Sequence, residues 1–240
     1  MLIEARIASA RVAWTDRHGG VSTPPYDTAN LSAASADDAA SVAENRRRLA
    51  TRLELVDPAR WWWLRQVHGN DVVHAHGDPP SIPPTADAAL TTDVGVPLVV
   101  LTADCAPIVL ATDGAVAVVH SGWQGLLAGV VERAVQALRD VASSPRVIAW
   151  VGPCIHPARY EFGRADLDRL VAELGTAVEG VTDWGTPALD LPGGVRAALV
   201  RAGVDDVHDV DVCTAASTDH FSHRRDAETG RQALVAVLDG

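Results

Sequence analysis

Cys105 and His120, which can bind a metal ion or act as a nucleophile and its base, lie on either side of a predicted tight turn. Cys105 directly precedes one apolar run, and His120 ends the next. The dipeptide Asp113-Gly114 separates the two runs, and Asp-Gly in that context is a strong signal for a β-hairpin with a two-residue loop. The sequence therefore predicts that the chain folds back and brings the two residues to one end of a hairpin.

The hairpin register predicts how close the two side chains come. A two-residue loop pairs Thr112 with Ala115, and counting back from this pair places Pro107 opposite His120. Side chains alternate along a strand, so Cys105 shares the face of Pro107. Cys105 and His120 are then diagonal neighbours, roughly 7–8 Å apart between backbones, and their side chains can converge on one atom.

A converging cysteine and histidine have three interpretations. The pair can bind a metal together with a third ligand, because zinc takes both residue types and a catalytic zinc keeps one position open. It can form a thiolate–imidazolium nucleophile, as in a cysteine hydrolase. Both residues can instead be core packing. Packing is disfavoured by the polar residues at the same strand ends, which are Thr102, Asp104, Ser121 and Gln124.

His68 is the candidate for the third ligand. It follows the segment 60–67, which is predicted to be a strand, so His68 is expected at a strand end beside a turn. His74 and His76 lie beyond that turn and are weaker candidates. Neither H-E-x-x-H nor the zinc-deaminase pattern occurs in the sequence. A zinc ion held by His68 and the hairpin pair would lower the pKa of a bound water to about 7.

The segment after the hairpin is a candidate anion site. Residues 121–125 read Ser-Gly-Trp-Gln-Gly and run from the second strand into a predicted helix. Glycines let backbone N–H groups face a ligand, and a helix N-terminus favours negative charge. A plain strand-to-helix turn explains the same residues, so this segment alone does not decide between the two.

Composition narrows the classes of function. The chain has 240 residues, of which 48% are hydrophobic, enough for one α/β domain spanning residues 1–240. The net charge of −11 argues against general nucleic-acid binding, which needs a basic surface. The chain has no lysine, which excludes Schiff-base, P-loop-lysine and Ser–Lys chemistry. Three cysteines, an odd and sparse set, indicate a reducing compartment and no disulfide scaffold.

No targeting or membrane segment is predicted. Acidic and basic residues come too early in the N-terminal sequence for a signal peptide, and no apolar run is long enough to cross a bilayer. We therefore expect a cytoplasmic protein that acts on a small molecule, has no nucleic-acid or membrane partner, and is a monomer.

Predicted strands and helices follow an order typical of an α/β domain with helices outside the sheets. Apolar and β-branched runs predict strands within 2–15 and over 60–67, 88–92, 97–102, 106–112, 115–120, 146–151, 206–212 and 232–238. Periodicity predicts helices over 37–54, 123–141, 164–174 and 189–202. The tryptophans at 61–63 are expected to bury at least Trp62, although they could also form a partner surface.

Six motifs, in order along nearly the whole chain, resemble those of one family. The central three are QVHG at 66–69, TADC at 102–105 and HSGWQG at 120–125. The flanking ones are RHGGVS at 17–22, GPCIHPARYEFG at 152–163, and CT, FSHRRD and GRQ within 213–232. The chain is similar to the laccase-domain proteins, once labelled multicopper polyphenol oxidoreductases and now regarded as zinc-dependent purine nucleoside enzymes.

The resemblance implies a four-layer α/β/β/α fold of mixed sheets flanked by helices. It implies metal ligands at His68, Cys105 and His120, and we expect the latter two to act in catalysis as well. The implied activity is phosphorolysis of adenosine, inosine and guanosine, with adenosine deaminase and methylthioadenosine phosphorylase side activities. Some bacterial members are described as editing factors for a peptidoglycan precursor. Zn2+ fits one Cys-plus-two-His site better than copper, because multicopper oxidases need many histidines.

Phosphate and substrate are expected to bind at residues of the flanking motifs and the third central one. Arg17, Arg224 and Arg225 are candidate phosphate clamps, because a guanidinium binds phosphate with two hydrogen bonds. His18 and Gln124 are further candidates for binding substrate. Gln124 stands where the family motif commonly has arginine, so its side chain can donate a hydrogen bond but carries no charge.

Other residues near the motifs have competing interpretations. Asp104 is a candidate catalytic residue, as a general base or a group that orients a ligand, and equally a solvated or capping residue. Cys154 and His156 could form a second metal site or line the pocket, where Tyr160 and Phe162 could pack on a base. A non-enzymatic binding protein is the alternative to both classes of enzyme.

Overall fold

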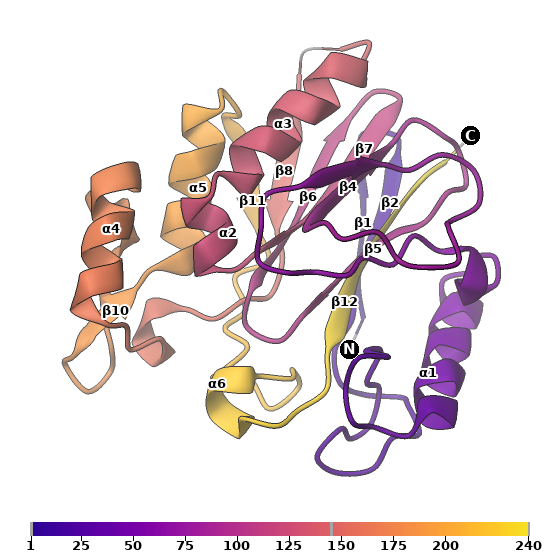
Figure 1. Cartoon of the computed structure of the whole chain (residues 1–240), viewed down its shortest axis with the longest axis horizontal. Helices are drawn as coiled ribbons and strands as arrows, with labels where there is room; N and C mark the ends of the chain where they lie inside the picture. Colours follow the sequence, from indigo (N-terminus) through magenta and orange to yellow (C-terminus); the bar gives the residue numbers. More distant parts are fainter. Residues whose placement is uncertain (1, 145, 240) are drawn as a thin grey trace.

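The structure is a computed structural model that describes residues 2–144 and 146–239, and its strands form two large sheets packed face to face (Figure 1). One buried apolar cluster lies between the sheets, and two more lie between each sheet and its own helices. Helices therefore cover both outer faces, which confirms the expected four-layer α/β/β/α arrangement.

Helices on the larger sheet form the first two layers. The sheet has six strands in the order β11 (Asp206–Asp209), β8 (Ile148–Val151), β6 (Ala106–Thr112), β7 (Ala115–Ser121), β4 (Ala88–Thr91) and β3 (Val72–His74). Four helices lie together on one side of Figure 1: α2 (Trp123–Leu127), α3 (Val130–Val141), α4 (Arg164–Leu174) and α5 (Leu191–Arg201). In α3, apolar residues recur at helical spacing, so Val131, Val135 and Leu138 are all buried in the cluster shared with the sheet.

The smaller sheet and a single helix form the other two layers. Four strands lie in the order β1 (Ile3–Ile7), β2 (Ala10–Trp14), β12 (Gln232–Leu238) and β5 (Leu98–Thr102). Helix α1 (Ala39–Arg52) covers its outer face on the opposite side of Figure 1 from α4. Asp38 begins α1 as its N-cap, because its carboxylate accepts a hydrogen bond from the backbone N–H of Ser41.

Short elements complete the chain. They are β9 (Glu179–Val181), β10 (Pro187–Leu189), α6 (His223–Asp226) and three 3-10 turns at Pro58–Arg60, Pro157–Arg159 and Thr176–Val178. Within the described part of the chain, no helix combines the length and apolar character needed to span a membrane.

The β6–β7 hairpin has the predicted register. Thr112 pairs with Ala115 and Pro107 pairs with His120. Gly114 in the turn has a φ of 79°, a backbone conformation that glycine adopts without a side-chain clash. Both strands are buried along their whole length, because β6–β7 is covered by helices on one face and by the second sheet on the other.

The predicted strand over 60–67 is wrong. The segment makes only isolated bridges, from Trp62 to Leu98 and from Arg65 to Thr85, which lie beside different sheets. It spans the gap between the sheets, so it cannot build a continuous ladder with either. Trp61 and Trp62 are buried in different apolar clusters, which confirms the expected burial of Trp62. The three tryptophans therefore do not form an exposed surface for a partner.

The predicted helix over 123–141 is two helices, α2 and α3. The break falls at Gly129, whose φ of 79° is left-handed and interrupts the helical hydrogen bonds. The predicted strand over 206–212 ends at Asp209, before Asp211 turns the chain with a φ of 57°. These differences leave the hairpin and the layers as expected.

Candidate metal centre

His68, Cys105 and His120 come together at the end of the β6–β7 hairpin. Their ligand atoms all lie within 4.8 Å of one another. The sulfur of Cys105 is 3.7 Å from Nε2 of His68, and the two imidazole rings are 4.8 Å apart, edge to face. Two nitrogen atoms and a sulfur atom at these separations can coordinate a single ion after small side-chain movements.

The hairpin supplies two members of this triad. His120 belongs to β7 and is 3% exposed, while Cys105 directly precedes β6 and is half-buried. The register that pairs Pro107 with His120 places Cys105 diagonally across from the histidine. The convergence predicted from the Asp-Gly turn is therefore present.

His68 reaches the triad from a loop and not from a strand end as expected. Its φ is 59°, an uncommon value for a residue with a side chain. Three consecutive backbone N–H groups, of Val67, His68 and Gly69, donate hydrogen bonds to the carboxylate of Asp87 at 3.1, 2.9 and 2.8 Å. These bonds hold the loop in the conformation that presents the His68 ring to Cys105.

Asp87 also contacts His120. The carboxylate lies 2.8 Å from Nδ1 of the ring, and the backbone N–H of His120 donates to the Asp87 carbonyl at 2.7 Å. Asp87 is completely buried. The sequence analysis missed this residue, although a carboxylate directly before the apolar strand β4 is a signal that could have been weighed.

Contacts within the triad and with Asp87 shift the pKa values of Cys105 and His120. Removal from water alone would raise the pKa of the Cys105 thiol, but the imidazoles of His120 and His68 outweigh this and lower it to about 6. Burial alone would lower the pKa of His120, but Cys105 and Asp87 raise it to about 9. Cys105 is therefore a thiolate at neutral pH, the form that both metal binding and nucleophilic attack require.

A glycine makes room for the triad. A Cβ atom on Gly122 would lie 2.7 Å from Cδ2 of His68 and 3.0 Å from the sulfur of Cys105. Gly122 is the N-cap of α2, with φ −83° and ψ 175°, so its backbone conformation does not itself require glycine. The side chain is absent because the ligand atoms occupy its space.

A cleft of about 790 Å³ opens onto the triad. His68, Cys105 and His120 all line it. Polar and charged residues on its other walls include Tyr26, Arg65, His223, Glu228 and Arg231. The volume is in the range of small-molecule sites, roughly 300–1,000 Å³.

Arg231 is a cation of the cleft wall. One of its terminal nitrogens donates to the carbonyls of Thr229 and Gly230, at 2.9 Å each. Among the described residues no carboxylate forms an ion pair with it, and its Nε and Nη2 groups donate no hydrogen bond. Burial lowers the pKa of the guanidinium, which remains a cation because the ordinary pKa of arginine is above 12.

Asp104 lies beside Cys105 but points to another part of the chain. Its φ of 103° is far from the usual range, and one carboxylate oxygen accepts from Thr214 Oγ1 at 2.7 Å while the other accepts from the backbone N–H of Arg224 at 2.6 Å. The carbonyl of Asp104 accepts from Ile155. The bond to the backbone N–H of Arg224, in the first turn of α6, is that of a capping residue, and neither carboxylate oxygen contacts a side chain of the triad.

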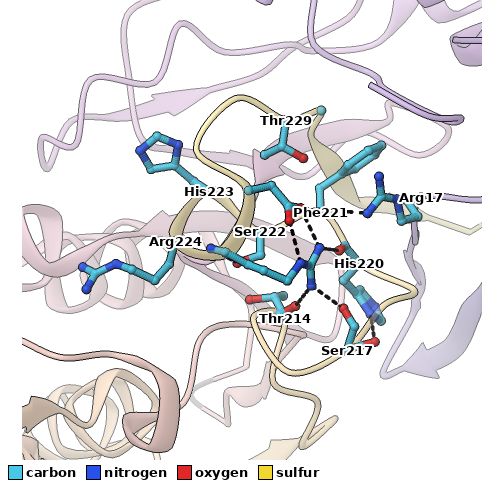
Figure 2. A network of polar contacts seen from close by, with 12 residues as sticks. Arg17, Thr214, Ser217, His220, Phe221, Ser222, His223, Arg224 and Thr229 are labelled. Atoms are coloured by element: carbon cyan, nitrogen blue, oxygen red, sulfur yellow. Dashed lines mark hydrogen bonds and ion pairs between the residues drawn. The ribbon is translucent and has the colours of Figure 1, made fainter. Parts of the chain in front are cut away.

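Two of the expected phosphate clamps bind their own protein. The guanidinium of Arg225 donates hydrogen bonds to the backbone carbonyls of Thr214, Ser217 and His220, in the network that Figure 2 shows. It also pairs with the carboxylate of Asp226. All five N–H groups of Arg225 are used in this way. Arg17 donates to the carbonyl of Asp27 and pairs with the carboxylates of Asp27 and Asp226.

The remaining three expected substrate residues also lie outside the lining of the cleft. His18 pairs with Asp219 at 2.9 Å, and Gln124 is exposed in the first turn of α2. Arg224 points away from the network in Figure 2, donates to the carbonyl of Glu161 and stacks over Tyr160 at 4.7 Å. Arg224 is therefore beside the expected base-packing residues Tyr160 and Phe162, which contact each other.

Cys154 and His156 do not form a second metal centre. Among residues 2–144 and 146–239, the only group of three or more ligand-type side chains with metal-binding spacing is His68, Cys105 and His120. Cys154 is a buried free cysteine whose backbone forms an isolated β-bridge with that of Cys213. The sulfur of Cys213 accepts from the backbone N–H of His156. Cys154 and His156 therefore connect their own segment to the segment of Cys213.

The fold and this cluster define an α/β/β/α protein with one candidate metal centre beside a cleft. The model of the family described as multi-copper polyphenol oxidoreductase laccase matches residues 11–239. The chain belongs to this family, as the six motifs indicate.

Relatives over the full length carry a more specific name. The Streptomyces griseus protein named purine nucleoside phosphorylase ORF3 is 44% identical over 251 residues, which cover 100% of both chains. The Escherichia coli K12 protein named purine nucleoside phosphorylase YfiH is 38% identical, over 92% of this chain and 91% of that protein.

Solved structures share the fold. The crystal structure of the Neisseria meningitidis protein NMB0706 superposes with a TM-score of 0.88 at 32% identity, covering 100% of this chain and 99% of that one. YlmD from Geobacillus stearothermophilus gives a TM-score of 0.89 at 31% identity, over 97% and 93% of the two chains.

Proposed function

We propose that this protein is a zinc-dependent purine nucleoside phosphorylase that acts on adenosine, inosine and guanosine. The observation that carries the proposal is the His68–Cys105–His120 cluster in the wall of a cleft of about 790 Å³. Relatives at 38% and 44% identity are named purine nucleoside phosphorylases, which supports this substrate class.

Zinc is the ion that the donor set favours. One thiolate and two imidazoles are usual zinc ligands, and three protein ligands leave a position open for catalysis. A multicopper centre needs several metals, whereas the described residues offer one group of three ligands. When bound, zinc would supply Lewis-acid chemistry in the wall of the cleft.

Phosphorolysis sets two tasks for the residues of the chain. The bond between C1′ of the ribose and N9 of the purine breaks, a phosphate oxygen bonds to C1′, and the purine leaves with a proton. The cleft must therefore hold phosphate close to the ribose and keep water from taking its place. Arg17 and Arg225 are engaged in their own loops, so we assign phosphate to a cation of the cleft.

Arg231 is our candidate for the phosphate ligand. It lines the same cleft as the triad, is half-buried, and has two N–H-bearing groups free of partners within the described chain. A partly desolvated guanidinium binds phosphate more strongly than an exposed one, because less water competes for its donors. Arg65 also lines the cleft, but its Nε donates to Thr85 and its side chain is exposed.

Replacing Arg231 with Met should raise the KM for phosphate about 10- to 100-fold and leave the KM for the nucleoside within about threefold. Hydrogen bonds to charged groups contribute about 1.5–3 kcal/mol, and 1.4 kcal/mol is a factor of ten. Initial rates measured over a matrix of phosphate and inosine concentrations test this. Arg65→Met is the control and should change the KM for phosphate much less. An equal rise in both KM values of Arg231→Met would contradict the assignment.

Adenosine deamination and methylthioadenosine phosphorolysis are proposed as side activities of the same centre. Deamination replaces the amino group on C6 of adenosine with oxygen and needs no phosphate. Deamination therefore predicts inosine and ammonia from adenosine in the absence of phosphate, while phosphorolysis predicts adenine only when phosphate is added.

The purified protein tests the proposal directly. It should contain about one zinc per chain and convert adenosine and phosphate to adenine and ribose-1-phosphate, with activity that is lost in chelator and restored by Zn2+. Activity that persists in chelator would favour a cysteine hydrolase with a Cys105–His120 pair. Bound zinc without turnover of any purine nucleoside would favour a binding protein.

A further inference from the structure

We propose that Asp87 is the positioning residue of the metal centre and sets the geometry of both histidines through one carboxylate. The inference rests on the proposed zinc site, but concerns how this chain builds it. Asp87 is completely buried in the core, directly before β4, and receives four hydrogen bonds on two oxygens.

His120 is fixed by Asp87 at two points. Its Nδ1 shares a hydrogen bond of 2.8 Å with the carboxylate, and its backbone N–H donates to the Asp87 carbonyl at 2.7 Å. When Nδ1 keeps its proton and donates it in a hydrogen bond to the carboxylate, a ring that has lost its Nε2 proton presents the Nε2 lone pair that an ion needs. Such carboxylate–histidine pairs fix the tautomer and the ring orientation of metal ligands.

His68 is fixed through its backbone. The N–H groups of Val67, His68 and Gly69 converge on the two Asp87 oxygens, which supports the left-handed φ of 59° at His68. Val67 is 51% exposed and has no apolar burial to hold the loop. Gln66 and Asn70 tie the two ends of the loop to the backbone of Leu101 and Ala128. The carboxylate holds the middle of the loop, where the His68 ring lies 3.7 Å from the Cys105 sulfur.

The two histidines are coupled because one atom serves both. Oδ1 of Asp87 accepts from the backbone N–H of His68 and from Nδ1 of His120. Any movement of this oxygen moves both ligands together. An asparagine has the same shape, but its amide nitrogen would meet either the Val67 and Gly69 donors or the His68 and His120 donors, so two donors would lose their acceptor whichever way it turned.

Asp104, the other buried carboxylate beside the triad, makes no hydrogen bond to the two histidines. Its carboxylate oxygens accept from Thr214 and Arg224, and neither oxygen contacts a ring of the triad or the loop of His68. Of these two buried carboxylates, Asp87 alone hydrogen bonds to the proposed ligands.

Asp87→Asn should lower the affinity for Zn2+ about 10- to 100-fold, the usual effect of losing an outer-shell partner. The affinity is measured by competition with a chromophoric chelator on the folded, metal-free chain. Thr91→Val is the matched control. Thr91 is a completely buried residue of β4, the strand that Asp87 directly precedes, and its hydroxyl donates to the Ala75 carbonyl, away from the triad. We expect its zinc affinity to stay within twofold of the wild-type value. Asp87→Asn with wild-type affinity, or an equal loss in Thr91→Val, would overturn the inference.

Two spectroscopic measurements separate positioning from general stability. Co2+ bound to the wild-type chain should give thiolate-to-metal and ligand-field bands, which Asp87→Asn should shift or broaden. NMR of the metal-free wild-type chain should place a slowly exchanging ring proton on Nδ1 of His120, and this needs no variant. An Nδ1 that carries no proton would overturn the inference even if the asparagine variant failed to fold. Neither measurement depends on catalysis, so a wild-type chain that binds zinc without phosphorolysis would refute the proposed function and leave the role of Asp87 intact.

Discussion

Cys105→Ala is expected to give a folded protein that retains almost no zinc and loses phosphorolysis by about a thousandfold or more. The variant removes the thiolate of the triad, and the loss corresponds to about 4 kcal/mol of transition-state stabilisation, as expected for removal of a catalytic metal. Cys105 is half-buried and directly precedes β6, so a smaller side chain there leaves the hairpin register unchanged. Metal analysis, steady-state kinetics and a thermal unfolding curve measure the three quantities.

Cys213→Ala is the matched control for this variant. Cys213 is also a half-buried free cysteine, but it lies outside the triad and only accepts a weak backbone hydrogen bond from His156. Its zinc content and activity should equal those of the wild-type chain. A Cys105→Ala protein that kept its zinc would show that the sulfur is not a ligand. A wild-type activity that survived chelation but vanished in Cys105→Ala would identify the residue as a nucleophile.

The hairpin was predictable because its information is local. Asp113-Gly114 determines the turn, the turn determines the register, and the register places Cys105 diagonal to His120. Strong local periodicity likewise predicted α4 over the residues it occupies, 164–174, and β12 over 232–238. In each case the structure is determined by residues that are close together in the sequence.

His68 could be identified as a ligand candidate but not placed. Its loop has no regular structure, and its conformation depends on Asp87, which follows 19 residues later and is buried directly before β4. No periodicity encodes a contact between a loop and a distant carboxylate. The same reason explains why Asp87 itself was missed.

The phosphate residues were hard to choose for a different reason. An arginine in a sequence is a cation with five donors, and the sequence does not show how many of them the protein itself uses. Arg225 uses all five within its own loops, whereas Arg231 keeps two groups free among the described residues. Tertiary packing alone distinguishes a structural arginine from one that is available to a ligand.

Gly122→Ala should weaken zinc binding roughly 10- to 100-fold while the fold remains stable. The added methyl group would lie 2.7 Å from the His68 ring and 3.0 Å from the Cys105 sulfur, so the two ligands would have to move apart. Overpacking of this kind costs about 1–3 kcal/mol, and 1.4 kcal/mol is a factor of ten in affinity. The backbone at Gly122 has φ −83°, which alanine adopts without strain. The cost therefore falls on the metal centre and not on the chain conformation.

Gly163→Ala provides a control with the same helix position. Gly163 is the N-cap of α4, as Gly122 is of α2, its φ is −66°, and a Cβ there would meet no atom within 4 Å. Exchanging an N-cap glycine for alanine should lower stability slightly and similarly in both variants. Zinc titrations of the two metal-free proteins should then differ, with Gly163→Ala equal to the wild type and Gly122→Ala much weaker. Equal affinities would mean that the triad can open by the width of a methyl group, and that the close contact around Gly122 does not constrain the ligands.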